Sequence, residues 1–374
     1  MSHPALNQTP APPATRTDPS ALAARVPLQL VGPDGRLTEA GHLRGVDVDL
    51  ARRLYRDMVL ARALDREAVA LQRQGELSLW LQCEGQEAAQ VGSVHALADR
   101  DHIFPSYREH AVGLVRGLTP AELLAQWRGI AHAGWDPAEH HLHFNSLVLG
   151  TQTLHAVGYA LGCRLDGDDS VTVVYFGDGA ASQGDVNEAF NWAATMALPV
   201  LFVCQNNQWA ISTPTSKQFG TSLHDRAAGF GLRSWWVDGN DALAVHAVTT
   251  EAVESVRRGQ GPALVEAETY RIGGHSTSDD PKRYRTDEEL DAWRRRDPLA
   301  RLRTALTDLG VEAAWFDTVD ADGRELAART RAECQALAGP DLRDLFAEVY
   351  ADPHPVERER ASYEAHLELT GRGR

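Results

Sequence analysis

A long amphipathic helix is predicted in the first quarter of the chain, between Asp49 and Gln74. Apolar residues recur there at the three- and four-residue spacing that places them on one face of a helix. Gly75 comes directly after this pattern and predicts the end of the helix. The predicted buried face is formed by Leu50, Leu54, Met58, Ala61, Ala68 and Leu71.

Two further helices have characteristic first turns. Thr119 and Glu122 stand three residues apart with Pro120 between them, which is typical of a capping box with proline in the first helical turn. This pattern predicts a helix over Ala121–Trp127. The segment Thr286-Asp-Glu-Glu289 has the same spacing of Thr and Glu and predicts another helix start of the same kind.

The middle of the chain changes to short β-branched runs. Val171–Phe176 and Val200–Cys204 are mostly apolar, which is typical of strands that helices cover on both faces. A further strand is predicted over Ala263–Tyr270, after a helix around Leu243–Arg257. The alternation favours an α/β fold with a doubly wound, mostly parallel sheet. The helix between the first two strands is predicted from Val186, Ala189, Phe190, Ala193, Ala194 and Ala197.

The two ends of the chain differ from this core. Residues 1–36 are predicted to form a disordered or extended tail, because the first 26 residues are rich in Ala, Pro and Thr and poor in apolar clusters. The glycines and proline of Val31–Gly35 predict a turn at its end. Residues 37–374 are predicted to form a single domain, and the region after Pro298 is expected to be mainly helical and polar.

Composition narrows the classes of function. The chain has 374 residues, 43% of them hydrophobic, and a formal net charge of −15, which argues against nucleic-acid binding. It lacks the ~20 consecutive apolar residues of a membrane helix and the ~7–15 of a secretory signal, so we expect no membrane association and a cytoplasmic location. Four widely spaced cysteines favour reduced thiols over a disulfide framework or a zinc site: Cys83, Cys163, Cys204 and Cys334.

The candidate chemistry lies in the turns that follow two of the predicted strands. Gly177-Asp178-Gly179 follows the first, and Asn206-Asn207-Gln208-Trp209 follows the second. Ligands of open α/β sheets bind at the carboxyl ends of the strands. A carboxylate, an amide oxygen and a backbone carbonyl suit magnesium, and the helix amides after the glycines can meet phosphate oxygens. Each turn alone is ordinary, but after adjacent strands the two together predict a magnesium and diphosphate site.

This pair of turns resembles the thiamine-diphosphate-binding motif. The segment YFGDGAASQGDVNEAFNWAATMALPVLFVCQNNQWAISTPTS resembles the alpha subunit of the 2-oxo acid dehydrogenases, and the similarity covers about Leu37 to Tyr350. It implies a thiamine-diphosphate-binding fold. It also implies that Asp178, Asn207 and the Trp209 carbonyl hold Mg²⁺. Cofactor contacts are implied for Gly177, Gly179 and Ala180, the last two presenting amides to the diphosphate.

Two upstream segments extend the resemblance. In Ile103-Phe-Pro-Ser-Tyr-Arg108, Tyr107 and Arg108 match residues that bind diphosphate oxygens, which a guanidinium can do through two bonds. In Ser146-Leu-Val-Leu-Gly-Thr-Gln152, Leu149 matches the apolar residue that bends the cofactor into its V shape. A monovalent-cation site, for K⁺, is implied for Ser146, Thr151 and Gln152.

A downstream segment, Tyr270-Arg-Ile-Gly-Gly-His-Ser-Thr-Ser-Asp-Asp280, resembles the active-site loop of the family. The resemblance implies that His275 stands near the reacting carbon as a hydrogen-bond donor and proton shuttle. It also implies that Arg271 supports the diphosphate. Ser276 stands where eukaryotic relatives are phosphorylated, but we predict no such regulation in this chain.

Some positions depart from the family pattern. Gln205 replaces an Arg found in some relatives, and Trp209 replaces a common Tyr, which matters little if only its carbonyl binds the metal. Leu147 stands where some members have a Ser that touches the cofactor, so that contact is not predicted. His140, His141 and His143 lack clear ligand spacing, and we expect no metal on them.

The resemblance implies partners as well. The chain has no room for a second, pyrimidine-binding α/β domain, and Gly85-Gln-Glu-Ala88 resembles a non-catalytic counterpart of the activating motif. The activating Glu is therefore expected from a separate beta subunit, in an assembly of two alpha and two beta chains. The lipoyl domain of an acyltransferase is expected to accept the acyl group. Alone, the chain should bind cofactor poorly and be inactive.

Three interpretations of function stay open at this point. The segment His275-Ser-Thr-Ser-Asp-Asp280 resembles enzymes for branched-chain 2-oxo acids such as 3-methyl-2-oxobutanoate, because pyruvate enzymes usually have a Met between the serines. A pyruvate or acetoin dehydrogenase alpha subunit is the first alternative. A non-catalytic regulatory subunit that binds magnesium and diphosphate is the second, and the presence of Tyr107, Arg108 and His275 argues against it.

Overall fold

The computed structural model describes residues 26–339, 346, 349–352 and 354–371 of the chain. Its centre is a five-stranded sheet in the order β1-β2-β3-β7-β6, in which all neighbouring strands are parallel. A short antiparallel pair, β4 (Trp209–Ala210) and β5 (Thr213–Pro214), follows β3. The strands of the main sheet are β1 His102–Phe104, β2 Thr172–Gly177, β3 Val200–Asn206, β6 Arg233–Asp238 and β7 Ala263–Glu268.

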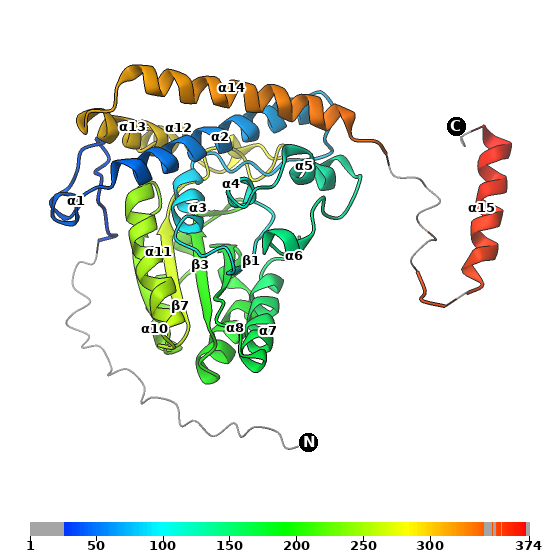
Figure 1. Ribbon diagram of the computed structural model, residues 1–374, viewed down its shortest axis with the longest axis horizontal. Coiled ribbons are helices and arrows are strands. Elements are labelled where there is room, and N and C mark those ends of the chain that lie inside the picture. Colours follow the sequence, from blue (N-terminus) through cyan, green and yellow to red (C-terminus); the bar gives the residue numbers. More distant parts are fainter. Residues whose placement is uncertain (1–25, 340–345, 347–348, 353, 372–374) are drawn as a thin grey trace.

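Helices cover both faces of this sheet, as predicted for a doubly wound fold (Figure 1). On one face lie α3 (Glu87–Val94) and α11 (Ala242–Arg257), and outside them α2 (Val48–Arg73) packs against α14 (Ala313–Ala336). On the other face lie α7 (Thr151–Asp166), α8 (Gly184–Thr195) and α10 (Leu223–Gly229). The remaining helices are α1 Glu39–Arg44, α4 His110–Val115, α5 Pro120–Arg128, α6 Pro137–His140, α9 Thr215–Gln218, α12 Asp287–Arg294, α13 Pro298–Asp308 and α15 Val356–Thr370.

The strands alternate their side chains between two apolar clusters. Val173 and Tyr175 of β2 point to the cluster that includes α2, α3 and α11, whereas Val174 and Phe176 point to the cluster of α7 and α8. All four are fully buried, which explains why the strand is apolar at successive positions. Burying each such side chain stabilises the fold by about 1.5–3 kcal/mol.

The predicted long helix is confirmed as α2. Leu54, Met58, Ala61, Ala68 and Leu71 are buried, and Leu50 is partly buried against the same cluster. The helix at Thr119 has the complete capping box. At Thr286 only one half of the box forms. The Thr286 hydroxyl accepts the Glu289 amide, but the Glu289 carboxylate accepts hydrogen bonds from Trp209 Nε1 and Tyr270 Oη instead.

The predicted N-terminal tail reached residue 36, but residues 28–36 pack onto the domain. Leu28 pairs with Val237 beside β6, and Leu30 and Val31 are 5% and 2% exposed. Both of their amides donate to Asp241 Oδ2 at 2.7 Å. The tail boundary was therefore placed too late, because a few apolar residues are enough to bury this segment. Residues 1–25 lie outside the described part of the chain.

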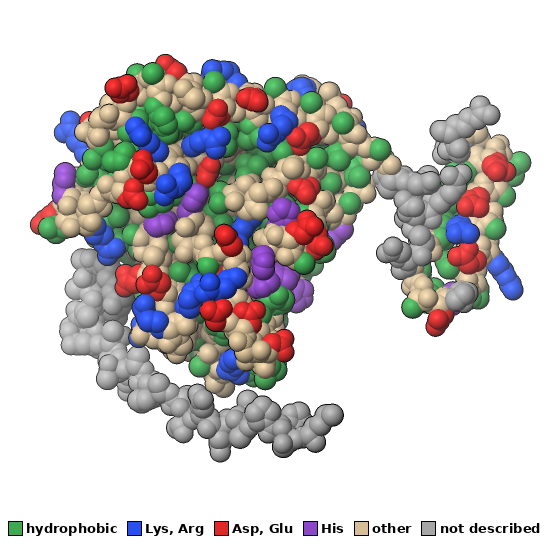
Figure 2. Space-filling view, viewed as in Figure 1, with side chains coloured by type: hydrophobic (Ala, Val, Ile, Leu, Met, Phe, Trp, Pro, Cys, Tyr) green, Lys and Arg blue, Asp and Glu red, His purple; other side chains and the backbone are tan. Residues whose placement is uncertain are grey.

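No helix among the described residues is long and apolar enough to cross a membrane. On the face drawn in Figure 2, acidic and basic side chains are intermixed rather than gathered into regions of one sign. The four cysteines are free and buried, as expected for reduced thiols.

Replacing Arg301 by methionine is expected to destabilise the fold by about 2–4 kcal/mol, because it removes the more buried of the two arginines that pair with the buried Asp238 carboxylate and takes a donor from two carbonyls. Arg301 of α13 is 3% exposed, donates to Asp238 Oδ2 at 3.0 Å, and also donates to the Val31 and Gly32 carbonyls. The measurement is the free energy of unfolding by urea denaturation of the purified protein.

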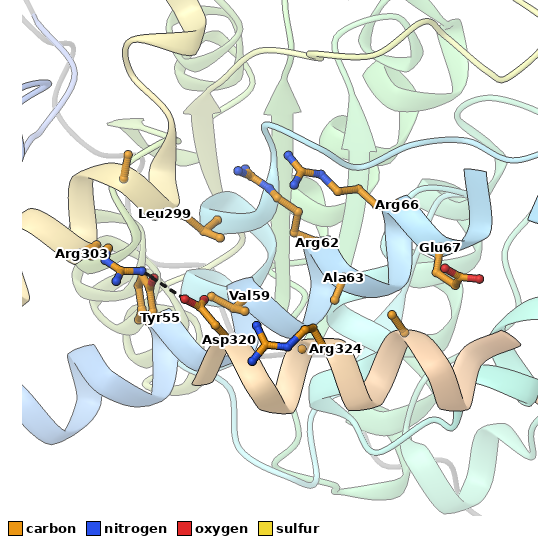
Figure 3. Close-up of a pocket in the computed structure, with 13 residues that line it drawn as sticks. Tyr55, Val59, Arg62, Ala63, Arg66, Glu67, Leu299, Arg303, Asp320 and Arg324 are labelled. Carbon is orange, nitrogen blue, oxygen red and sulfur yellow. Dashed lines mark hydrogen bonds and ion pairs between the residues drawn. The ribbon is translucent and has the colours of Figure 1, made fainter. Parts of the chain in front are cut away.

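Arg303→Met on the same helix is the matched control. Figure 3 shows Arg303 facing Asp320 across an open groove between α2, α13 and α14. Their ion pair is 3.4 Å long, and the two side chains are 42% and 40% exposed, so its loss should cost no more than about 1 kcal/mol. Equal losses in the two variants would contradict the role given to Arg301.

Candidate functional site

A cavity of about 250 Å³ opens at the carboxyl ends of β2 and β3. Its walls come from separate parts of the chain: Gln86 at the start of α3, the segment after β1, the loop before α7, the turns after β2 and β3, and the loop after β7. The sequence analysis predicted eleven of its lining residues, which are Tyr107, Arg108, Leu149, Gly177, Asp178, Gly179, Ala180, Asn207, Trp209, Arg271 and His275. Parallel strands bring these distant segments to one edge of the sheet.

Three polar groups meet at one end of the cavity: the Asp178 carboxylate, the Asn207 side-chain amide and the Trp209 carbonyl. One end of the Asn207 amide lies 3.3 Å from Asp178 Oδ1 and 3.1 Å from the Trp209 carbonyl oxygen, and its other end lies 3.0 Å from Gln86 Oε1. With its NH₂ group inward the amide donates to Asp178 and to the Trp209 carbonyl, and with its oxygen inward it presents a third oxygen beside theirs. A carboxylate, a carbonyl and an amide that can present its oxygen have the donor chemistry of a magnesium site.

Asp178 is held rigidly within this group. It is 1% exposed, and burial raises the pKa of its carboxyl, while a hydrogen bond from Gln218 works in the opposite direction. Gln218 Nε2 donates to Asp178 Oδ2 at 2.8 Å, and the backbone amide of Asn207 donates to Asp178 Oδ1 at 3.3 Å. A buried carboxylate that lacks a cationic partner in direct contact is costly, and a metal ion would remove that cost.

Two arginines make the opposite side of the cavity basic. Arg108 donates to the carbonyls of Gln82 and His275, and its guanidinium lies 5.7 Å from the Tyr107 ring centre. Arg271 is 1% exposed and donates to the carbonyls of Trp209 and Ile211 at 3.0 and 2.8 Å. Burial, with Arg108 nearby, lowers the pKa of Arg271 to about 10, so it stays charged at neutral pH. Two cations at one cavity favour an anionic ligand.

His275 lines the same cavity with a neutral imidazole. Burial, followed by the charges of Arg108 and Arg271, lowers its pKa to about 4. Its ring meets the Tyr107 ring edge to face at 6.1 Å, and its amide donates to Asp279 Oδ2 at 2.7 Å. At neutral pH the ring therefore offers one N–H donor and one nitrogen acceptor, which is what a proton shuttle requires.

The turn after β2 leaves little space for side chains. A Cβ atom added at Gly179 would lie 2.9 Å from the Ala210 Cβ, so only glycine fits between β2 and β4. Gly177 ends β2, and Ala180 begins a short 3₁₀ turn before α8. The backbone of this turn can therefore come close to a bound phosphate.

The structure separates the residues of the predicted monovalent-cation site from this cavity. Leu149 lines the cavity, but Ser146, Thr151 and Gln152 do not. Ser146 Oγ accepts the Val148 amide at 3.2 Å. Gln152 Nε2 donates to the Tyr175 carbonyl at 3.0 Å, whereas its Oε1 is buried without a hydrogen-bond partner.

The three neighbouring histidines each have other partners. His143 stacks on Phe104, and His140 hydrogen-bonds to the Arg116 carbonyl. Among the described residues, no three His, Cys, Asp or Glu side chains come together at metal-binding distance.

Several lining residues were not predicted. Glu109 is 5% exposed with a pKa raised by burial, and its Oε1 accepts from Gln205 Nε2 at 2.5 Å. Glu109 directly follows Tyr107 and Arg108 in the sequence, and this position could have indicated that it lines the cavity. Gln86 was considered only as part of a motif, not as a partner of Asn207. The others are Ser106, Gln183, Gln205, Ala210 and Ile211.

Comparison with known proteins gives consistent matches. A family model described as "Dehydrogenase E1 component" matches residues 55–322. A Mycobacterium tuberculosis protein named 3-methyl-2-oxobutanoate dehydrogenase subunit alpha is 45% identical over 351 residues, which cover 92% of this chain and 95% of the relative. A human protein named 2-oxoisovalerate dehydrogenase subunit alpha, mitochondrial, is 38% identical over 336 residues, which cover 85% of this chain and 75% of the relative. An Arabidopsis thaliana protein, 2-oxoisovalerate dehydrogenase subunit alpha 2, mitochondrial, is 40% identical over 354 residues, which cover 90% of this chain and 74% of the relative.

Proposed function

The chain belongs to the dehydrogenase E1 component family, and we propose from this that it is the alpha subunit of a branched-chain 2-oxo acid dehydrogenase. The reaction is the oxidative decarboxylation of 3-methyl-2-oxobutanoate and related 2-oxo acids, with transfer of the acyl group to a lipoyl-lysine. The fold is the thiamine-diphosphate-binding fold. The single observation that supports the site best is that all the residues expected to bind diphosphate and magnesium line one cavity.

Asp178, Asn207 and the Trp209 carbonyl would hold Mg²⁺. The supporting observation is that the Asn207 side-chain amide lies 3.3 Å from Asp178 Oδ1 and 3.1 Å from the Trp209 carbonyl oxygen, so that with its oxygen inward it offers one ion three oxygens. Magnesium prefers oxygen ligands and often shares them with phosphate groups, so the ion would neutralise both Asp178 and part of a bound diphosphate. Gly177, Gly179 and Ala180 would form the backbone cradle next to it.

Tyr107, Arg108 and Arg271 would hold the diphosphate from the other side. Arg108 is fixed by the Gln82 and His275 carbonyls and so needs little reordering when an anion binds. Arg271 also supports the metal site, because its guanidinium donates hydrogen bonds to the Trp209 and Ile211 carbonyls. These bonds fix the turn that carries the metal-binding Trp209 carbonyl. Leu149 would support the bent form of the cofactor.

Thiamine diphosphate, when bound, supplies a carbon nucleophile for the oxo group and a cationic ring that accepts the electron pair released with carbon dioxide. This chain contributes His275, whose neutral ring can donate one N–H to a developing oxyanion and can accept or return a proton at its other nitrogen. His275 is therefore the residue to which we assign proton transfer during passage of the acyl group to lipoate.

We also propose K⁺ near Ser146, Thr151 and Gln152. The supporting observation is the buried Gln152 Oε1, which has no partner and would suit a cation.

An alpha subunit implies a beta partner. We propose two alpha and two beta chains, with the activating Glu from the beta subunit and a lipoyl domain of the acyltransferase as the acyl acceptor. Leu147 and Val148, directly before Leu149, are 60% and 67% exposed and provide an apolar surface for such a partner beside the cavity. The cytoplasmic location stays a prediction.

A decarboxylation assay tests this function. The chain is expressed with its beta subunit and supplied with thiamine diphosphate, Mg²⁺ and an artificial electron acceptor, and kcat/KM is compared for 3-methyl-2-oxobutanoate and pyruvate. We expect a preference for the branched acid of about tenfold or more, because each added methyl group that fills an apolar pocket contributes about 1–3 kcal/mol.

The other outcomes separate the alternatives. Preference for pyruvate, or for acetoin when it is added as a third substrate, would preserve the cofactor and site assignments but change the substrate. Tight cofactor binding without turnover of any 2-oxo acid would support a regulatory subunit instead.

A further inference from the structure

A fully buried carboxylate on α2, Asp65, lies outside the cofactor cavity and has no role in the chemistry described above. It accepts three hydrogen bonds, all from one short stretch of chain. Trp80 Nε1 and the Cys83 amide donate to Oδ1 at 2.7 and 3.0 Å, and the Glu84 amide donates to Oδ2 at 3.1 Å. Asp65 therefore fixes the stretch Trp80–Gly85, named here the 80–85 segment, at three points.

The 80–85 segment in turn holds the active-site loop Tyr270–Asp279, named here the 270–279 loop. The Thr277 amide donates to the Trp80 carbonyl at 2.9 Å, and the Trp80 amide donates to Thr277 Oγ1 at 3.1 Å. The Ile272 amide donates to the Glu84 carbonyl at 3.1 Å. These bonds lie on both sides of His275 in the sequence, so the loop is attached before and after its reactive residue.

The same segment also fixes Arg108. Arg108 donates one bond to the Gln82 carbonyl and another, of 2.9 Å, to the His275 carbonyl. Gln82 lies between Trp80 and Cys83, the two residues that Asp65 Oδ1 binds. Asp65 therefore holds Cys83, which directly follows Gln82, the residue whose carbonyl orients Arg108.

We propose that Asp65 is a positioning residue of the enzyme: through the 80–85 segment it sets the placement of Arg108 and of the loop that carries His275. The inference rests on the proposed function for the roles of Arg108 and His275. It does not depend on contact between Asp65 and any ligand.

Close packing between the segment and the loop explains why small shifts would be transmitted. A Cβ atom at Gly85, which has φ +96°, would lie 2.3 Å from the Tyr270 carbonyl oxygen. A Cβ atom at Gly273 would lie 2.3 Å from Gln82 Oε1. The backbone of each stretch therefore lies against the other, once against a carbonyl and once against the Gln82 side chain, and movement of one stretch displaces the other.

Asp65→Asn is the variant that tests this inference. The substitution keeps the shape of the side chain, but an NH₂ group meets one donor if it takes the place of Oδ2 and two donors if it takes the place of Oδ1. Hydrogen–deuterium exchange is measured on the enzyme assembled with its beta subunit. Amides of the 270–279 loop, including Ile272 and Thr277, are expected to exchange about tenfold faster or more, because a charge-assisted hydrogen bond has been lost.

Asp101→Asn is the matched control. Asp101 is also buried and also accepts backbone amides, but those of Ala98 and Val171, at the amino ends of β1 and β2 and so at the opposite edge of the sheet from the cavity. It should lower overall stability while leaving exchange in the 270–279 loop as in the wild type. Should Asp65→Asn fail to fold, Thr277→Val removes the bond from the Trp80 amide without touching the core, and faster exchange of the loop is again expected.

Kinetics provide a second measurement. For Asp65→Asn we expect kcat for acyl transfer to lipoate to fall about tenfold with KM for the 2-oxo acid changed less than about twofold, because misplaced catalytic groups affect the transition state more than substrate binding. Wild-type exchange in the loop together with wild-type kcat would overturn the inference. Absence of 2-oxo acid turnover in the wild type would instead refute the proposed function, and the exchange measurement would still decide the role of Asp65.

Discussion

Asp178→Asn should weaken magnesium-dependent binding of thiamine diphosphate by about a hundredfold or more, because the change removes the only charged ligand from the proposed metal group. The isosteric amide retains the volume of the side chain. It cannot neutralise the ion, and it places an NH₂ group where the metal would need an oxygen ligand. Isothermal titration calorimetry of the assembled enzyme, at several Mg²⁺ concentrations, measures the effect.

Asp166→Asn is the control for this experiment. Asp166 is an exposed carboxylate at the last residue of α7, so its replacement removes the same charge away from the cavity. Its affinity for the cofactor should equal that of the wild type. If Asp178→Asn also retained wild-type affinity and magnesium dependence, the metal assignment would be wrong.

His275→Ala is expected to leave cofactor affinity within about threefold of the wild type and to slow acyl transfer to the lipoyl domain by about 10²–10⁴-fold, the usual contribution of a positioned acid–base group. The affinity should persist because Arg108 and Arg271 keep their backbone partners when the imidazole is removed. Single-turnover reduction of an added lipoyl domain measures the transfer. The rate with an artificial acceptor measures decarboxylation separately.

His42→Ala, at an exposed position of α1, is the control and should change neither rate. Equal losses of decarboxylation and acyl transfer in His275→Ala would place the residue at an earlier step than we propose. Wild-type rates for both would remove His275 from the chemistry.

The central fold was predictable because its strands and helices have strong local patterns. Val171–Phe176 and Val200–Cys204 are apolar at successive positions, and they became neighbouring parallel strands. β1 has only three residues, and β6 is partly exposed and starts with an arginine. Neither strand therefore shows a clear pattern of apolar and polar residues. Strands of this kind are defined by the neighbour with which they pair, and a single sequence does not contain that information.

The candidate site was predictable to the extent that its residues follow strands. Asp178 and Asn207 stand at the ends of β2 and β3, so the parallel sheet places them together. The contact of Gln86 with Asn207 joins residues 121 positions apart, and the bond between Trp80 and Thr277 joins residues 197 apart. Such pairs depend on tertiary packing, and no local spacing indicates them.

The half-formed capping box at Thr286 also shows that a tertiary contact cannot be predicted from local spacing. The sequence has the complete signature, and the Thr286 hydroxyl does bind the Glu289 amide. The Glu289 carboxylate is occupied by Trp209 at 3.0 Å and Tyr270 at 2.9 Å, which belong to the turn and the loop on either side of the cavity. A tertiary contact has replaced the local one.

The packing of residues 28–31 beside β6 protects the sheet from self-association. β6 is the last strand of the sheet, and an uncovered edge strand offers its amides and carbonyls to another chain. Leu28 occupies two of those groups, since its amide donates to the Trp236 carbonyl and its carbonyl accepts the Asp238 amide. Shortening the chain past this point would leave a strand with two adjacent tryptophans open to edge-to-edge aggregation, so affinity tags and deletions belong before residue 26.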